Sequence, residues 1–428
     1  MMIGKICTDI GSSRRRPHLV FRRLFVLAAS LASFVTAIPA FAQQGKPPAP
    51  TGVRWEDDSI RFGDSVRIEP KIRVQADIPL WNNQEPIDDH FDWGSRRIGV
   101  NGELFDRVQF QVERALQDDD DDDTAWRDVY ADVRINRALQ VRGGRFKLPF
   151  SMERNTSRDE LDFLQRATAV RAISPTRDTG VMVHGRVANR VVEYEVGVFQ
   201  HADGLEVVDD PNAWSALGTA LAGRVIVSPI RNNDEGPTRD LQFGAALVRN
   251  TVPEGPNGVV GRSFDGERFF DRFNVNGQRT RLGLEGLWRG RRVTLKGEWL
   301  QMTDQRLLQS VTAEDLSDLI IRGYYVTGVI RVFGESGRNG QAVDLAARFD
   351  RMTLGSGNSS DEPFTNPRAD HIAPLAKDTW TFGGNWQLHR WIRIQGNLIR
   401  EALVDPLGVR DLSSEPVLTA IMRLQFAL

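Results

Sequence analysis

The chain has 428 residues, with 55 Lys and Arg against 57 Asp and Glu and a formal net charge of −2. This balance excludes the strongly basic surface of nucleic-acid-binding proteins, so we expect no nucleic-acid partner. Hydrophobic residues make up only 40% of the chain, and its length permits one large domain or two to three ordinary ones.

The N-terminal segment has the three parts of a secretory signal peptide. Five arginines, the last of them Arg23, precede an apolar stretch from Leu24 to Ala37, and the small-x-small site Ala40-Phe41-Ala42 follows. The apolar stretch is shorter than the roughly 18 residues that a membrane anchor needs. We therefore predict a signal peptide over residues 1–42.

Removal of this segment changes the chemistry of the mature chain. Cys7, the only cysteine, lies inside it, so the mature chain has no disulfide and no thiolate metal site. The segment also carries six basic residues and one acidic residue, which leaves a mature net charge of −7. Residues 43–65 then form a short periplasmic N-terminal segment.

From residue 66 onward, apolar and polar residues alternate. In the segment from Val66 to Ile78, Ile72 and Val74 fall on one face and Arg73 falls on the other. Side chains alternate across a strand, so such a segment is apolar on one side and charged on the other. Sixteen segments of this kind are expected near residues 66–77, 95–104, 107–116, 126–135, 138–146, 178–187, 190–199, 219–228, 240–249, 279–288, 291–301, 322–333, 341–351, 379–388, 391–401 and 417–426.

The connections between these segments alternate between short and long. Tight turns join 95–104 to 107–116 and 279–288 to 291–301, whereas other links reach about thirty residues. A soluble β-sandwich has no reason to separate connection lengths in this way, but a transmembrane barrel has short periplasmic turns and long external loops. We predict an all-β fold, a transmembrane antiparallel β-barrel of 16 strands over residues 66–428, in the outer membrane of a Gram-negative cell.

Aromatic residues near the ends of the predicted strands are typical of the two membrane interfaces. The alternative, an ordinary soluble core, is disfavoured because the polar faces carry so many charges. In a barrel those faces line water. The aromatic residues are Trp126, Trp288, Trp299, Tyr324, Tyr325, Trp380 and Trp391.

A run of six aspartates lies in the expected external loop between the third and fourth strands. Like charges in such a loop stay hydrated, so we interpret the run as solvated. A weaker alternative is a divalent-cation site, because Ca²⁺ prefers carboxylate oxygens. No EF-hand spacing supports that alternative. The residues are Asp118, Asp119, Asp120, Asp121, Asp122 and Asp123.

Seven stretches, in the same order along the chain, carry a family resemblance. They are "WRDVYADVRI" (126–135), "GGRFKLPFSMERNTS" (143–157), "RDTGVMVHG" (177–185), "GYYVTGVIRVFGE" (323–335), "AVDLAARFDRMTL" (342–354), "GGNWQLHRWIRIQGN" (383–397) and "IMRLQFAL" (421–428). Their sequence resembles the phosphate-selective porins O and P. The resemblance implies a homotrimer of sixteen-stranded barrels, each with an anion-preferring channel that the inward-folded third loop, residues 147–177, makes narrower.

Anion passage needs positive charge along the path. Arginine can hold an oxyanion through two N–H donors, whereas lysine acts as a point charge. The third loop carries six basic residues against four acidic ones, and wall arginines could extend its positive path. For each arginine, a salt-bridged structural role is the alternative. The candidates are Lys147, Arg154, Arg158 and Arg166 at the constriction, Arg171 and Arg177 elsewhere in the loop, and Arg73, Arg97, Arg142 and Arg348 on the wall.

The resulting hypothesis is passive diffusion of small inorganic or organic anions, phosphate or similar oxyanions first, with no catalysis and no cofactor. Its partners are outer-membrane lipid and two further copies of the chain. A weakly selective general porin is the alternative, because acidic residues interleave with the basic ones on the polar faces. An outer-membrane enzyme is disfavoured, because no mature histidine lies in a nucleophile motif. A plugged receptor is also disfavoured, because residues 43–65 are too short for a plug.

Overall fold

The computed structural model describes residues 52–83, 92–116, 125–200, 219–233, 236–256, 258–259, 261–264, 268–270, 273–335, 340–356, 368, 370, 372–404 and 415–428. The predicted signal peptide (1–42) and the aspartates 118–123 lie outside these ranges. Within the described ranges, no helix has both the length and the apolar character needed to cross a membrane.

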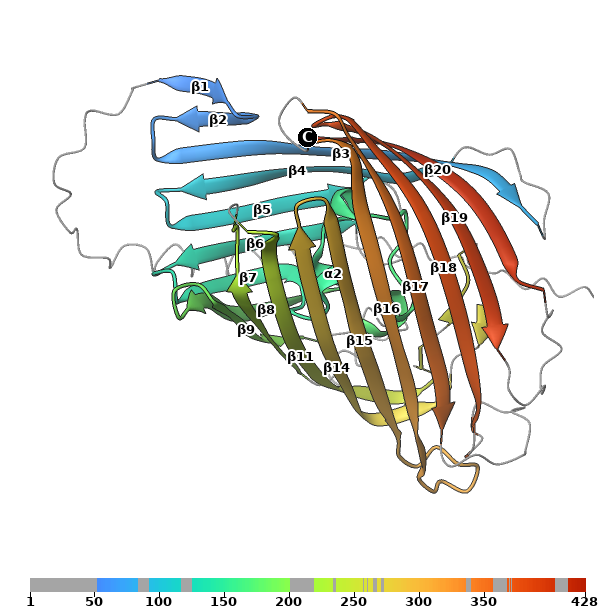
Figure 1. The fold of residues 1–428 in the computed structure, drawn as a ribbon. Coiled ribbons are helices and arrows are strands. Elements are labelled where there is room, and N and C mark those ends of the chain that lie inside the picture. The colour runs from blue at the N-terminus through green and yellow to red at the C-terminus, as the bar shows by residue number, and fades with distance from the viewer. Residues whose placement is uncertain are drawn as a thin grey trace, which may run out of the picture. The chain divides into compact units, whose positions relative to one another are not determined.

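Sixteen long strands of one antiparallel sheet correspond one to one with the sixteen predicted segments (Figure 1). They are β3 (Val66–Asn82), β4 (Asp92–Leu104), β5 (Val108–Ala115), β6 (Trp126–Arg134), β7 (Gln140–Lys147), β8 (Arg177–Val187), β9 (Val192–Phe199), β10 (Ala220–Ile230), β11 (Thr238–Gly255), β14 (Val275–Gly290), β15 (Val293–Arg306), β16 (Leu316–Gly334), β17 (Ala342–Ser356), β18 (Ile372–His389), β19 (Ile392–Val404) and β20 (Val417–Ala427). The short β12 (Gly261–Arg262) and β13 (Arg268–Phe270) pair with each other in a separate small sheet.

The sheet closes on itself because its last strand pairs with its first long strand. β20 runs antiparallel to β3, with Arg423 opposite Asp77 and Phe426 opposite Val74. The other long strands pair with their neighbours along the chain. Closure leaves no edge of unpaired backbone groups to face lipid. The predicted antiparallel 16-stranded barrel is therefore confirmed.

Part of the predicted N-terminal segment 43–65 forms a hairpin. Its strands are β1 (Val53–Glu56) and β2 (Ser59–Phe62), and β2 pairs with the start of β3, where Ile60 lies opposite Ile68. β20 pairs with β3 only from Arg73 onward. The hairpin thus continues the sheet beside the first residues of β3. An ion pair of 2.7 Å between Arg390 and Asp58 joins it to the turn between β18 and β19.

The predicted strand bounds agree best at the end of the barrel that carries the short turns, such as 291–292 and 390–391. At the opposite end several strands are longer than predicted: β11 ends at Gly255, β16 begins at Leu316 and β18 begins at Ile372. Alternation of apolar and polar residues reports burial in lipid. The alternation is lost where a strand extends beyond the bilayer into water, although the backbone pairing of the strand continues there.

The apolar residues of the alternating pattern lie on the outer face. Val196 and Val198 are 58% and 49% exposed on the described chain, and Trp299, Tyr324 and Trp380 are exposed with them. Tyr325, which we expected in the same interfacial group, is only 1% exposed and points inward. It follows Tyr324 directly, and successive side chains of a strand point to opposite faces.

The connection between β7 and β8, residues 148–176, folds back inside the barrel (Figure 1), and we call it the third loop. It contains α2 (Met152–Asn155), the 3₁₀ turn η1 (Arg158–Glu160) and α3 (Thr168–Ile173), and α3 packs against β15, β16 and β17. Its buried residues Phe150 and Val170 join a core with the inward-facing Met302 and Ile321. The loop and this wall therefore fill one side of the lumen.

Glycines on the inner face let the third loop approach the wall. A Cβ added to Gly323 of β16 would lie 2.4 Å from the Cβ of Ala169 in α3 and 2.8 Å from the carbonyl oxygen of Arg351. A Cβ added to Gly383 of β18 would lie 3.0 Å from the ring of Phe163. A larger residue at either position would displace the loop or distort the wall.

We expect Gly323→Val to push α3 away from β16, to widen the channel and to lower the free energy of unfolding by about 1–3 kcal/mol. Single-channel conductance in planar bilayers should rise, and the midpoint of urea unfolding should fall. The matched control is Gly286→Val on β14, where nothing lies within 4 Å of the added Cβ. Equal conductance for the Gly323→Val variant and the wild type would show that the loop does not limit the channel.

Candidate functional site

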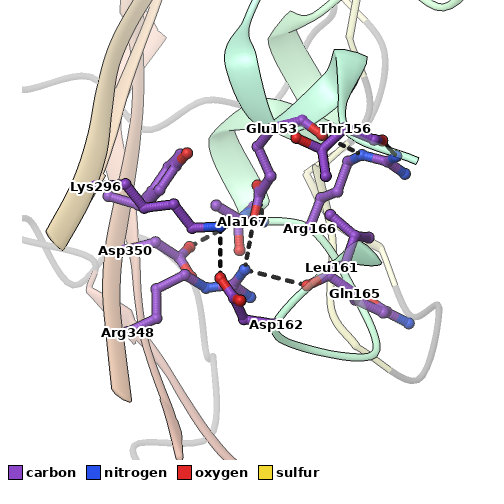
Figure 2. A network of polar contacts seen from close by, with 12 residues as sticks. Glu153, Thr156, Leu161, Asp162, Gln165, Arg166, Ala167, Lys296, Arg348 and Asp350 are labelled. Atoms are coloured by element: carbon purple, nitrogen blue, oxygen red, sulfur yellow. Dashed lines mark hydrogen bonds and ion pairs between the residues drawn. The ribbon is translucent and has the colours of Figure 1, made fainter. Parts of the chain in front are cut away.

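Arg348 of β17 holds the third loop against one wall of the barrel (Figure 2). Its guanidinium donates to a carboxylate oxygen of Glu153 at 3.1 Å and to the carbonyl oxygen of Gln165 at 3.1 Å. It also lies 4.7 Å from the ring centroid of Phe163. The Arg348 and Glu153 side chains are only 4% and 5% exposed, so this ion pair forms largely away from bulk water.

Two further contacts fix the loop to β15. The carboxylate of Glu298 accepts the backbone N–H groups of Met152 at 3.0 Å and Glu153 at 2.7 Å, at the start of α2. The backbone amides that open a helix lack partners within the helix, so a carboxylate there satisfies them. Lys296 pairs with Asp162 of the loop at 2.5 Å (Figure 2).

The tip of the loop reaches strands on both sides of the β3–β20 seam. Arg423 of β20 donates to the carbonyl oxygen of Leu164 at 3.1 Å, while Arg73 of β3 pairs with Asp159. Burial raises the pKa of the Asp159 carboxyl, but Arg73 and the hydroxyl of Ser157 lower it more, so the pKa lies below its usual value. Asp159 therefore stays ionised through neutral pH and keeps its contact with Arg73.

On its other side, the third loop faces a cavity of about 260 Å³ against β3–β9. Ten cationic side chains and three carboxylates line this cavity, which we call the cationic cavity. The cations are Lys71, Arg73, Arg97, Arg127, Arg142, Lys147, Arg154, Arg158, Arg166 and Arg177, and the carboxylates are Glu113, Asp128 and Glu195.

Eight of the ten predicted site residues come together in the cationic cavity. They are Lys147, Arg154, Arg158, Arg166, Arg177, Arg73, Arg97 and Arg142. The other two lie elsewhere: Arg348 anchors the loop, and Arg171 donates to the side-chain oxygen of Gln165 at 2.5 Å. Both border a much smaller space, of about 20 Å³, on the opposite side of the loop.

Sequence reasoning missed two cations of the cavity, Lys71 and Arg127. Lys71 could have been found, because it lies on the same face of the first predicted strand as Arg73. Arg127 could not, because its place depends on an irregularity in the pairing of β5 with β6, between Val112 and Arg114. Such an irregularity interrupts strict alternation without leaving a mark in the sequence.

Carboxylates hold several of the wall arginines in fixed positions. Arg142 pairs with Asp132 at 2.8 Å, and Arg177 pairs with Asp128 at 2.9 Å. Arg97 and Lys71 share Glu113, at 3.3 Å and 3.6 Å. Because the cavity has more cations than carboxylates, these pairs leave an excess of positive charge.

Lys147, at the end of β7, differs from these wall arginines. Its amine donates to the carbonyl oxygens of Asn155 at 3.1 Å and Thr156 at 3.2 Å, and it forms no ion pair within the described part of the chain. The loop residue Arg166 also donates to the carbonyl oxygen of Thr156, at 2.8 Å. Two positive charges therefore meet at one bend of the loop.

A second cavity, of about 380 Å³, shares Lys71, Arg73, Arg97 and Glu113 with the cationic cavity. It is also lined by residues of the turn between β18 and β19, Arg390 among them. The two cavities therefore adjoin, the second one toward the end with short turns, and we call them the two chambers of the passage. Five cations and three acidic side chains line the second chamber, so the excess of positive charge is greatest beside the third loop.

No cluster of metal-ligating side chains occurs among the described residues, which do not include the aspartate run. The passage instead offers N–H donors in excess over carboxylates. Such a surface can hold and pass anions by replacing part of their hydration.

Comparisons with known proteins agree with this architecture. The family model for phosphate-selective porin O and P matches residues 68–405. The chain is similar in structure to an anion-selective porin from Comamonas acidovorans, with a TM-score of 0.52, 14% identity, and coverage of 85% of this chain and 100% of that one. No match was found among curated proteins.

Two further solved structures show the same fold. The trimer form of OmpT, an outer membrane protein of Vibrio cholerae, has a TM-score of 0.52 at 11% identity and covers 85% of this chain and 100% of its own. The outer membrane channel DcaP of Acinetobacter baumannii has a TM-score of 0.52 at 10% identity and covers 85% of this chain and 98% of its own. At these identities the likeness concerns the fold alone.

Replacing Arg348 by Met should leave Glu153 buried without its cation, which costs on the order of 3–5 kcal/mol. Urea unfolding in lipid vesicles should show this loss, and the channel current should become noisier as the loop loosens. Arg331→Met is the matched control, because Arg331 pairs with Asp344 where the two side chains are 28% and 22% exposed. Such a pair contributes about 0–1 kcal/mol. Equal losses in both variants would show that Arg348 has no special anchoring role.

Proposed function

Because the chain belongs to the phosphate-selective porin O and P family, we propose that it lets phosphate and similar small oxyanions diffuse passively through its barrel. It is a channel of the Gram-negative outer membrane, as its family and its 16-stranded porin fold show. The observation that carries the proposal is the cationic cavity, in which ten cationic side chains face three carboxylates beside the third loop.

The shape of this site favours anions for a physical reason. Low-dielectric walls of a narrow passage focus the field of the charges that line it, which raises the local concentration of ions of opposite sign. The guanidinium groups of Arg142 and Arg177 are already oriented by Asp132 and Asp128. An oxyanion can therefore approach guanidinium groups that are already fixed in place, with little reorganisation of the site.

We also propose that the protein acts without a cofactor and assembles as a homotrimer. The trimer form of the similar OmpT barrel supports the assembly. Passive diffusion fits a passage whose two chambers share side chains.

A weakly selective general porin is the second candidate, and the ion pairs of the wall favour it. Arg73, Arg97, Arg142 and Arg177 each pair with a carboxylate. Paired charges attract a passing ion less than free ones do. The two candidates differ in whether the remaining excess of positive charge controls the current.

We expect the purified protein, in a planar bilayer under a KCl gradient, to show a reversal potential on the anion side. Phosphate added to the chloride solution should reduce the current, because an oxyanion that accepts several N–H donors leaves the site more slowly than chloride does. Cation preference without a phosphate effect would instead identify a general pore.

Neutralising Lys71 and Arg158 together, as Lys71→Gln with Arg158→Gln, should lower the anion-to-cation permeability ratio by about twofold or more. Both residues line the cationic cavity. Arg154 is less suitable, because it donates to the carbonyl oxygens of Arg171 and Ser174 within the loop, so its removal would also disturb the loop fold.

The control for this double variant is Arg289→Gln. Arg289 lies at the end with short turns, and its side chain is 52% exposed. Its loss should leave the permeability ratio near the wild-type value. If the double variant also kept that value, the cationic cavity would not be the selective part of the channel.

A further inference from the structure

Three arginines on the part of the wall formed by β16–β19 point out of the barrel rather than into it. They are Arg322 of β16, Arg351 of β17 and Arg400 of β19. Each falls on the face opposite to an inward-pointing neighbour: Ile321, Asp350 and Ile399 are buried inside. We call these three residues the outward arginine patch.

The patch is compact because of the strand register. Arg322 lies opposite Thr353 and Arg351 lies opposite Tyr324, so the two arginines are diagonal neighbours, about 7–8 Å apart at their backbones. Arg400 lies opposite Trp380 of β18, and Arg351 lies opposite Asp378 of the same strand. The three arginines therefore cover one area of four adjacent strands.

The height of the patch on the barrel follows from its aromatic neighbours. Tyr324, Phe349 and Trp380 form a row of rings on the outer face, with centroids 6.0 Å apart for the first pair and 4.8 Å for the second. Arg322 and Arg351 come two residues beyond Tyr324 and Phe349, toward the end with the long loops. Aromatic rows mark the boundary between hydrocarbon and headgroups, so Arg322 and Arg351 lie at headgroup level in the external leaflet, and Arg400, opposite Trp380, lies at the boundary itself.

The charges of this patch are largely unneutralised. Arg400 has no hydrogen-bond or ion-pair partner in the described part of the chain, and Arg322 donates only to the neutral side chain of Gln301, at 2.8 Å. Arg351 pairs with Asp378 at 3.4 Å, and these side chains are 38% and 23% exposed. A cation at the lipid boundary that lacks a protein partner needs water or an anionic lipid group beside it.

We propose that the outward arginine patch binds phosphate groups of the phosphorylated glycolipid in the external leaflet of the outer membrane. The guanidinium fork matches phosphate oxygens and can bind two of them at once. Arg351 lies opposite Tyr324 and Arg400 lies opposite Trp380, so the patch borders the aromatic row, where the acyl chains of the same lipid would contact the wall. Lipid A offers both a phosphate for the guanidinium groups and acyl chains for the aromatic row, whereas free phosphate offers only the phosphate.

The test uses the full mature protein in detergent, with binding of bis-phosphorylated lipid A measured by native mass spectrometry. The variant Arg322→Gln, Arg351→Gln and Arg400→Gln should bind lipid A about tenfold more weakly. Its permeability ratio should equal that of the wild type, because none of the three residues lines the passage.

The matched control replaces Arg289, Arg291 and Arg292 by Gln. It removes the same charge from β14 and the turn that follows it, at the end with short turns, and it should bind lipid A as the wild type does. Arg400→Glu is a second variant, because that side chain has no described partner to lose, and it should weaken binding even if the triple variant fails to fold.

Two further binding measurements identify the ligand. Dephosphorylated lipid A should bind the wild type as weakly as bis-phosphorylated lipid A binds the triple variant. Millimolar inorganic phosphate should not displace lipid A from the wild type. Any one of three results would overturn the proposal. The first is equal binding of phosphorylated and dephosphorylated lipid A, and the second is displacement of lipid A by inorganic phosphate. The third is wild-type affinity in the folded triple variant or in Arg400→Glu.

Discussion

The structure depends on one constraint: every backbone N–H and C=O group that faces hydrocarbon must be paired within the protein. A closed antiparallel sheet meets it, and the pairing of β20 with β3 supplies the closure. Closure also decides which side chains meet. Since successive residues of a strand point to opposite faces, the register fixes one set of side chains toward lipid and another toward the lumen. Arg348 and Arg351 illustrate this, because they lie three residues apart on β17 and point in opposite directions.

The third loop then gives the inward arginines different roles. On the wall of β14–β19 the loop covers the lumen, and Arg348 is used to hold Glu153 and the carbonyl oxygen of Gln165. On the wall of β3–β9 the lumen stays open, and Arg142 faces the cationic cavity. The same residue type on the same face of the sheet is thus an anchor in one place and part of the passage in another.

This division also explains what could be predicted from the sequence. Alternation identified all sixteen long strands, because each must present one apolar face to lipid. It also identified Arg73 and Arg142 as facing water. It could not distinguish the anchoring role of Arg348 from the place of Arg142 in the cavity. That difference depends on the path of the third loop, which is set by contacts with Glu298 and Gly323, far away in the chain. Strand ends beyond the bilayer were missed for a related reason: lipid imposes no pattern there.

A chain with a net charge of −2 can favour anions because selectivity depends on the charges of the narrowest part of the path, not on the sum over the molecule. The carboxylates that pair with arginines of the cationic cavity are not a contradiction. Asp132 and Asp128 orient Arg142 and Arg177, which reduces the reorganisation needed when an anion arrives. They also weaken the hold on that anion. Conduction requires binding that is favourable enough for entry and weak enough for release, so a partly neutralised row of arginines is better suited to transport than a fully unpaired one.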